Sequence, residues 1–197
     1  VAFDYAHTPS FPGLVTDHIR TILNAGAGSI TLGGDHFITL PILRAYAEKY
    51  GPMSVIHFDA HSDLWQDDDM SRIDHGTFFY KAVKTGLVDP KTSVQIGIRT
   101  ACDDYLGVEY IDARTVHEKG AAHVVARAKE IVGQRPTYVT FDIDSIDAGD
   151  EFPQRLDKAF SYTTVNGNNA TPSDARTVGR DTVNSAYGDL LKANAPA

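Results

Sequence analysis

The sequence predicts a three-layer α/β/α fold built on a mostly parallel sheet. Apolar runs of strand length alternate with longer segments of helical periodicity through the first 147 residues, which is typical of strands joined by crossover helices. The run at 53–59 is almost continuously apolar, as in strands that helices cover on both faces. Hydrophobic residues make up 42% of the 197, enough for one domain with a substantial core.

The first half of the chain predicts two helices and two strands. A helix is expected over 13–26, ended by Gly26, with one face formed by Leu14, His18, Ile19 and Ile22. A short buried strand is expected within 29–36, closed by a Gly-Gly turn, and a helix follows over 37–51. Pro41 is tolerated near the first turn of that helix, and Gly51 ends it. The apolar run at 53–59 is the second strand.

The second half continues the alternation. A helix is expected near 75–86, strands at 93–99 and 108–112, a helix over most of 113–133, and a strand at 137–144. After Asp150 the composition shifts to Asn, Thr, Ser and Gly without an apolar period. The sequence therefore predicts an α/β domain over 1–150 and a weakly ordered tail over 151–197.

Composition and charge exclude several classes of function. The net charge of −8 argues against nucleic acid, which requires basic patches. No apolar run approaches the roughly 18 residues that span a bilayer, so no membrane partner is expected. No secretory signal is visible, and the single cysteine, Cys102, allows no internal disulfide. These features favour a cytoplasmic location.

Acidic and imidazole side chains gather where the predicted strands end. They are His36 after the strand in 29–36, Asp59, His61 and Asp63 after the second strand, and Asp142 and Asp144 after the last. If the chain stays extended past Phe58, alternate residues point the same way. The carboxyl ends of parallel strands form the crevice where open α/β sheets place their sites. Four Asp and two His are thus expected to face one crevice.

Four carboxylates in one semi-buried crevice need compensating charge, because each raises the pKa of its neighbours. Two divalent cations would cancel the four charges, and six ligands for two ions require that one Asp from each cluster is shared. Oxygen-rich ligation with some imidazole and no thiolate favours Mn²⁺. The metals would lower the pKa of a bridging water and supply hydroxide at neutral pH.

The other ionisable residues receive separate interpretations. His75, in a polar turn before an apolar segment, is a candidate proton shuttle, because its reference pKa is near neutrality. Asp35 is interpreted as a turn or supporting residue, and His57 as a packed histidine or one that supports a ligand. The run 67–69 is interpreted as a solvated acidic loop. Surface positions are expected for His7, His18, His117 and His123.

Four stretches resemble the ureohydrolase (arginase/agmatinase) family: GGDH at 33–36, FDAHSDL at 58–64, IDHGTFFY at 73–80 and FDIDSID at 141–147. The stretch at 86–100, GLVDPKTSVQIGIRT, is similar to the agmatinase form. The resemblance implies an arginase/deacetylase-like fold with two Mn²⁺ ions per chain. It assigns one ion to His36, Asp59, Asp63 and Asp142, and the other to Asp59, His61, Asp142 and Asp144.

The same resemblance implies hydrolysis of a guanidinium group by attack of a metal-bridging hydroxide. The implied substrate is agmatine, a small cationic guanidine, which would be converted to putrescine and urea in polyamine biosynthesis. Asp144 would hold or pass a proton to the leaving amine, and His75 would relay protons to bulk water. Family resemblance further implies a homo-oligomer, either a trimer or a hexamer.

The resemblance ends near residue 148, where Ala148 replaces the Pro that the family pattern places after Asp147. The amino end is also short, so the domain is expected to be truncated at both ends, which would leave a sheet edge uncovered. Two alternatives follow. One is a catalytically impaired, agmatinase-like metal-binding fragment that lacks the substrate loop. The other is a deacetylase-like hydrolase with a single zinc ion, which a count of one metal per chain would favour.

Overall fold

A computed structural model describes residues 5–146 of the chain. The predicted tail over 151–197 lies outside the described residues. Within them the helices are α1 (Phe11–Asn24), α2 (Thr39–Tyr50), α3 (Phe78–Lys84) and α4 (Ala113–Val132). The strands are β1 (Ser54–Phe58), β2 (Val94–Ile98), β3 (Glu109–Asp112) and β4 (Thr137–Phe141). Short 3₁₀ turns stand at Tyr5–Ser10, His36–Ile38, His75–Thr77, Pro90–Thr92 and Ile143–Ser145.

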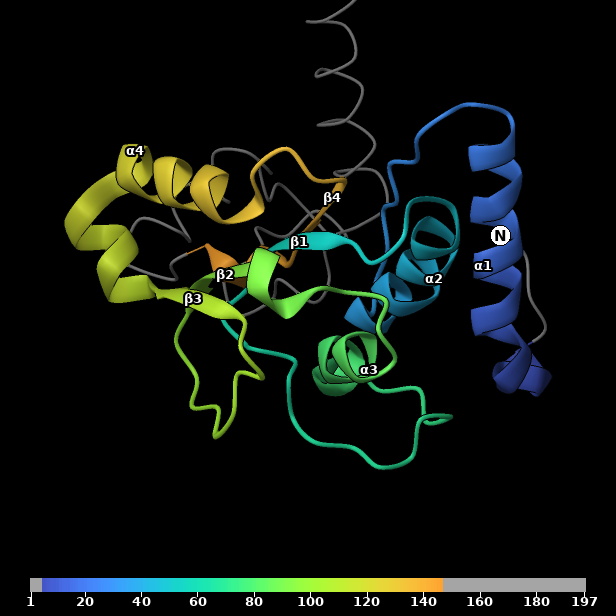
Figure 1. The fold of residues 1–197 in the computed structure, drawn as a ribbon. Helices are drawn as coiled ribbons and strands as arrows, with labels where there is room; N and C mark the ends of the chain where they lie inside the picture. The colour runs from blue at the N-terminus through green and yellow to red at the C-terminus, as the bar shows by residue number, and fades with distance from the viewer. Residues whose placement is uncertain (1–4, 147–197) are drawn as a thin grey trace, which may run out of the picture. The chain divides into compact units, whose positions relative to one another are not determined.

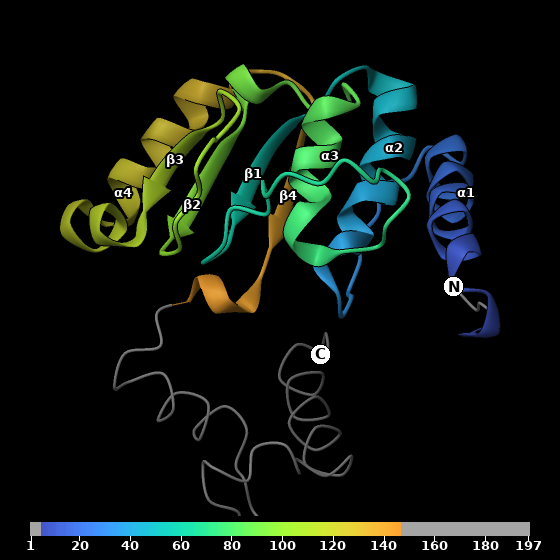
Figure 2. The ribbon, with the colours of Figure 1, turned by 90° about the horizontal axis from the view of Figure 1, so that it is seen from below.

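The four strands form a parallel sheet in the order β3-β2-β1-β4. Helices α1, α2 and α3 lie on one side of this sheet and α4 on the other (Figures 1 and 2). The predicted three-layer α/β/α fold is therefore confirmed. No helix among residues 5–146 is long and apolar enough to cross a membrane.

The central strand β1 explains the layers, because its side chains alternate between two cores. Val55 belongs to the core beneath α2 and α3, which includes Leu43, Phe78 and Phe79. Ile56 and Phe58 pack on the opposite face, against the core that α4 completes. This two-residue period is the geometry of a strand covered on both faces.

Two sequence predictions about the first hundred residues are wrong. The buried face of α1 is formed by Val15, Ile19 and Leu23, which are spaced by four, so the face predicted through Leu14 is wrong, whereas the exposed His18 agrees with its predicted surface position. Segment 29–34 forms no strand: Ile30 and Leu32 are 95% and 90% exposed. Among the described residues β4 pairs only with β1, so segment 29–34 makes no ladder with the free edge of β4, although the two line one pocket.

The interpretation of 67–69 as a solvated acidic loop holds for Asp68 and Asp69, which are exposed, but is wrong for Asp67. Asp67 is buried, with its Oδ2 2.8 Å from Nζ of Lys81, itself only 1% exposed. Arg72 Nε donates to the same oxygen at 3.0 Å, and Lys81 Nζ also donates to the Arg72 carbonyl. The pair fastens the loop between β1 and α3 onto α3, a role that local sequence did not reveal.

Candidate metal centre

The predicted site residues lie at the carboxyl ends of β1 and β4, which are neighbours in the sheet. Phe58 and Phe141 are register partners, so Asp59 and Asp142 follow at equivalent positions. The Asp142 N–H donates to the Phe58 carbonyl at 2.8 Å, and the Asp59 N–H donates to the Ile96 carbonyl at 3.1 Å. Backbone hydrogen bonds at the end of the sheet thus position both aspartates independently of their side-chain contacts.

The chain does not stay extended past Phe58, as the sequence analysis supposed. Asp59 Oδ1 accepts a hydrogen bond from the His61 N–H at 2.7 Å, and Asp142 Oδ1 accepts from the Asp144 N–H at 3.0 Å. Each pair is an Asx turn, in which the carboxylate bonds the backbone two residues on. Asp63 follows with φ of 51°, a left-handed conformation. These side chains converge because of the Asx turns, and not because alternate residues of an extended strand point the same way.

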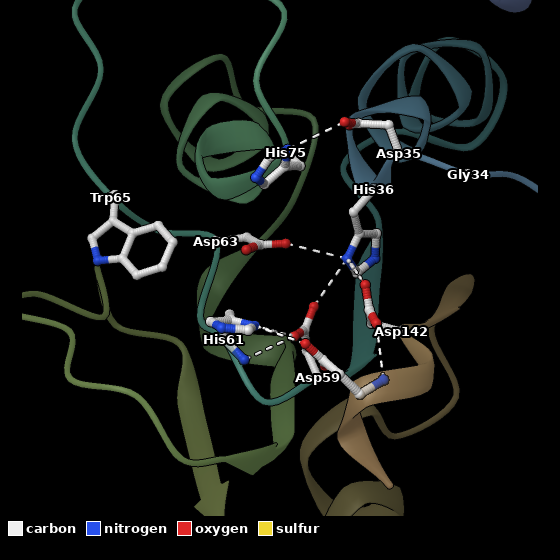
Figure 3. Close-up of a pocket in the computed structure, with 10 residues that line it drawn as sticks. Gly34, Asp35, His36, Asp59, His61, Asp63, Trp65, His75 and Asp142 are labelled. Carbon is white, nitrogen blue, oxygen red and sulfur yellow. Dashed lines mark hydrogen bonds and ion pairs between the residues drawn. The ribbon is translucent and has the colours of Figure 1, made fainter. Parts of the chain in front are cut away.

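The inner part of the site surrounds His36. Its Nδ1 lies 2.9 Å from Asp59 Oδ2, 3.2 Å from Asp63 Oδ2 and 3.5 Å from Asp142 Oδ2 (Figure 3). Although these are ion-pair distances, the buried Nδ1 makes no hydrogen bond of acceptable geometry with any described residue. The other ring nitrogen, Nε2, is 2.8 Å from Thr140 Oγ1 on β4, which holds the ring in place.

The outer part of the site is more open and shares Asp59. His61 Nδ1 lies 3.0 Å from Asp144 Oδ2 and 3.3 Å from Asp59 Oδ1. Asp144 Oδ1 accepts a hydrogen bond from the Ala60 N–H at 3.0 Å, which ties the two Asx turns together. The side chains of His61 and Asp144 are 42% and 40% exposed, whereas that of Asp59 is 2% exposed.

The pKa shifts follow from this crowding. Burial alone would raise the pKa of Asp59, but interactions with His36 and His57 outweigh it and hold that pKa well below its usual range. Burial lowers the pKa of His36, whereas the carboxylates of Asp59 and Asp63 raise it to about 9. Burial raises the pKa of Asp63 and of Asp144, and the charges of Asp59 and Asp142 add to the shift of Asp144. These crowded carboxylates therefore require a compensating positive charge.

All seven predicted site residues line one pocket of about 420 Å³. They are His36, Asp59, His61, Asp63, His75, Asp142 and Asp144. In Figure 3 His75 pairs with Asp35 and not with the predicted ligands; its Nδ1 is 3.2 Å from Asp35 Oδ2, and its side chain is 71% exposed. Asp35 also caps the turn that carries His36, because its Oδ1 accepts from the Phe37 N–H.

Sequence reasoning missed several residues around the pocket. Trp65 lines its wall, and Gly76 provides the space for this ring, since a Cβ there would lie 2.6 Å from Trp65 Cε3. Thr140 and Gln95 support the histidines from neighbouring strands. Both are ordinary strand residues by pattern: strand register places Gln95 beside His57, and the 3₁₀ turn at His36–Ile38 brings His36 to Thr140.

Known proteins share much of this sequence. A sequence model of the Arginase family matches residues 1–150. The chain is 51% identical over 144 residues to an agmatinase of Chromobacterium violaceum, covering 72% of this chain and 45% of the relative. It is 46% identical over 147 residues to an agmatinase of Proteus mirabilis, covering 75% and 47%. The chain thus spans about half the length of the curated relatives it matches.

Solved structures give the same picture. A hypothetical agmatinase from Burkholderia thailandensis superposes with a TM-score of 0.73 at 47% identity, covering 90% of this chain and 53% of that one. Proclavaminate amidino hydrolase from Streptomyces clavuligerus gives 0.65 at 36% identity, covering 86% and 54%. An arginase from Bacillus cereus, at 21% identity and a TM-score of 0.63 over 72% and 56%, supports the fold alone.

Proposed function

The chain belongs to the arginase family, and on that premise we propose that its pocket binds two Mn²⁺ ions and hydrolyses the guanidinium group of a small cation. Agmatine is the first candidate, with putrescine and urea as products, since two relatives that are 51% and 46% identical over the aligned 144 and 147 residues are agmatinases. One observation carries the proposal: a buried histidine nitrogen faces three carboxylate oxygens within 3.5 Å and hydrogen-bonds none of them.

The donor atoms fit a pair of divalent cations. We assign one ion to His36, Asp59, Asp63 and Asp142, and the other to Asp59, His61, Asp142 and Asp144. Asp59 belongs to both groups of close donor atoms among the described residues, as a shared ligand would, whereas Asp142 belongs to neither, so its assignment to both ions rests on the family resemblance. Four carboxylates balance the charge of two divalent ions, and hard oxygen donors with two imidazoles suit Mn²⁺. When Nε2 of His36 donates to Thr140 Oγ1, Nδ1 keeps the lone pair that a metal ligand needs.

His57 is close enough to the inner group to be considered a ligand as well. Its Nε2, however, lies 2.9 Å from Asp59 Oδ2 and its Nδ1 lies 2.9 Å from Gln95 Nε2, so both ring nitrogens already have partners. We therefore assign His57 a supporting role, which leaves the six ligands expected from the sequence.

The two ions would supply hydroxide at neutral pH by lowering the pKa of the water held between them. Side chains of the protein would transfer protons and contact the substrate. Asp144, held by the Ala60 N–H and half exposed to the pocket, would hold a proton and pass it to the leaving amine. His75 at the exposed rim would exchange that proton with solvent. Trp65 offers a flat aromatic wall, which suits a planar cation.

The alternative drawn from the sequence is an impaired, agmatinase-like metal-binding fragment, since productive binding requires that the substrate is positioned as well as the metals. This alternative predicts Mn²⁺ binding without urea release. The main proposal also includes a cytoplasmic location, assembly as a homo-oligomer and a role in polyamine biosynthesis.

The test measures bound Mn²⁺ per chain and urea released from agmatine, arginine and guanidinobutyrate by the full chain. We expect two ions and urea from agmatine, with both greatly reduced in Asp142→Ala. Asp68→Ala, which removes an exposed carboxylate outside the pocket, is the matched control and should behave like wild type. Two bound ions without urea would support the fragment alternative, one bound ion the single-zinc alternative, and no bound metal would overturn the proposal.

A further inference from the structure

A buried chain of hydrogen bonds stands behind the pocket and ends on Asp59. Gln95 Nε2 lies close to both the Ser62 carbonyl oxygen and His57 Nδ1, and His57 Nε2 lies 2.9 Å from Asp59 Oδ2. Both His57 and Gln95 have 0% exposed surface. The two residues are register partners on β1 and β2, so the parallel ladder itself brings their side chains together.

The positions of the protons in this chain follow from its far end. The Ser62 carbonyl oxygen can only accept, so the Gln95 atom beside it must be the NH₂ group. That same nitrogen lies 2.9 Å from His57 Nδ1 and has only hydrogens to offer, so Nδ1 accepts. A neutral imidazole whose Nδ1 accepts carries its proton on Nε2. His57 therefore donates to Asp59 Oδ2.

The surroundings keep this arrangement rigid and dry. The His57 ring meets Phe78 and Phe79 edge to face, with ring centroids 5.6 Å and 5.3 Å apart. Gln95 Oε1 is buried and has no hydrogen-bond partner among the described residues. A flipped amide would give this oxygen a partner at His57 but would set it against the Ser62 carbonyl, so the amide keeps the donating orientation.

We propose that Gln95 and His57 are positioning residues that orient the Asp59 carboxylate for both metal ions. Oδ2 is held by His57 and Oδ1 by the His61 N–H, so rotation of the carboxylate would break two hydrogen bonds at once. In this orientation Oδ2 of Asp59 also faces His36 in the inner part of the site, and Oδ1 faces His61 in the outer part. The role rests on the metal centre proposed above, whereas the proton positions do not.

Two measurements on the full chain test this role. The first is ¹⁵N NMR of the histidine ring in the metal-free protein, with the His57 signal assigned by its loss in His57→Gln. We expect the proton on Nε2 in wild type, where it is donated to Asp59 Oδ2. The second is Mn²⁺ titration calorimetry, in which Gln95→Met should weaken binding about 10–100-fold, the usual effect of losing a partner behind a ligand.

Three further variants separate positioning from folding. His57→Phe keeps an aromatic ring without a donor and should weaken Mn²⁺ binding, and His57→Gln, which restores an amide N–H, should recover part of the affinity. Ser54→Ala is the matched control, since it removes a buried hydrogen bond between Ser54 and Thr92 at the other end of β1. It should lower the melting temperature and leave Mn²⁺ affinity unchanged.

The outcomes distinguish the two proposals. A proton on Nδ1 of His57 in wild type, or unchanged Mn²⁺ affinity in folded Gln95→Met and His57→Phe, would overturn the positioning role even if the enzyme is active. A wild-type chain that binds no Mn²⁺ would instead overturn the metal centre, and the positioning role with it, while the NMR result would still establish where the His57 proton lies.

Discussion

Asp35 links the turn that carries His36 to the loop that carries His75. One carboxylate oxygen accepts from the Phe37 N–H at 2.8 Å, and the other lies 3.2 Å from His75 Nδ1. The hydrogen bond to Asp35 raises the pKa of His75 above its ordinary value. This pair therefore favours folding below about pH 6.5, and its contribution fades as the pH rises through the His75 pKa.

Replacing the carboxylate by an amide tests this link. Asp35→Asn keeps an oxygen for the Phe37 N–H but removes the charge, so the pKa of His75 should fall toward 6.5, its ordinary value. Proton NMR titration of the His75 ring in the metal-free protein measures it. Asp68→Asn removes a charge from the loop between β1 and α3 that carries His75, and it should leave the His75 pKa nearly unchanged. An equal shift in both variants would contradict the specific pair.

At the scale of elements, the Asp67–Lys81 pair connects the loop after β1 to α3. The hydrogen bond from Lys81 lowers the pKa of Asp67 below 3.8, its ordinary value. A carboxylate with a lowered pKa stabilises the fold above its unfolded-state pKa, and the contribution is lost as the pH falls through the folded-state value. The pair should therefore contribute throughout neutral pH and fail only in acid.

Breaking one side of this pair should be costly because the other charge stays buried. Lys81→Met is expected to lower the melting temperature at pH 7 by on the order of 5 °C or more. The double variant Lys81→Met/Asp67→Asn should lose less than the sum of the two single variants. Thermal unfolding followed by circular dichroism gives these values, and strict additivity would mean that the two side chains do not interact.

The helices and strands themselves were predictable where periodicity was strong. Apolar spacing and a terminal glycine gave the helix at 37–51, which the structure places at Thr39–Tyr50 with Gly51 at φ 81°. The helix over 113–133 is also present, although Gly120 breaks its regularity with φ of 74°. The strand predicted within 29–36 is absent, because Ile30 and Leu32 lie exposed near β4 without forming ladder hydrogen bonds to its free edge.

At the scale of the whole molecule, apolar surface is concentrated along the outer edge of the sheet. Val139 and Phe141 of β4 are 56% and 55% exposed, and Ile30 and Leu32 line a neighbouring pocket with them. Among the described residues β4 is an edge strand with one side unpaired. Such edges favour association with other chains. The edge expected from the sequence is thus present in the described part of the fold.

A charge on this edge should reduce association of the full chain. Val139→Lys is expected to lower the average mass measured by light scattering at high protein concentration, because lysine disfavours edge pairing. Leu14→Lys adds the same charge on the exposed face of α1 and should change the mass little. If the two variants behave alike, net charge rather than the β4 edge controls association.

The sequence by itself determined the parallel α/β architecture and the six candidate ligands, because crossover connections force the ends of neighbouring strands to one side of the sheet. Only the tertiary structure decided how those residues are supported. Gln95 reaches His57 through strand register, Thr140 meets His36 across a tertiary contact, and Asp67 is buried beside a lysine fourteen positions away on a helix. Such contacts join residues distant in the chain, and local sequence patterns carry no record of which distant partner completes them.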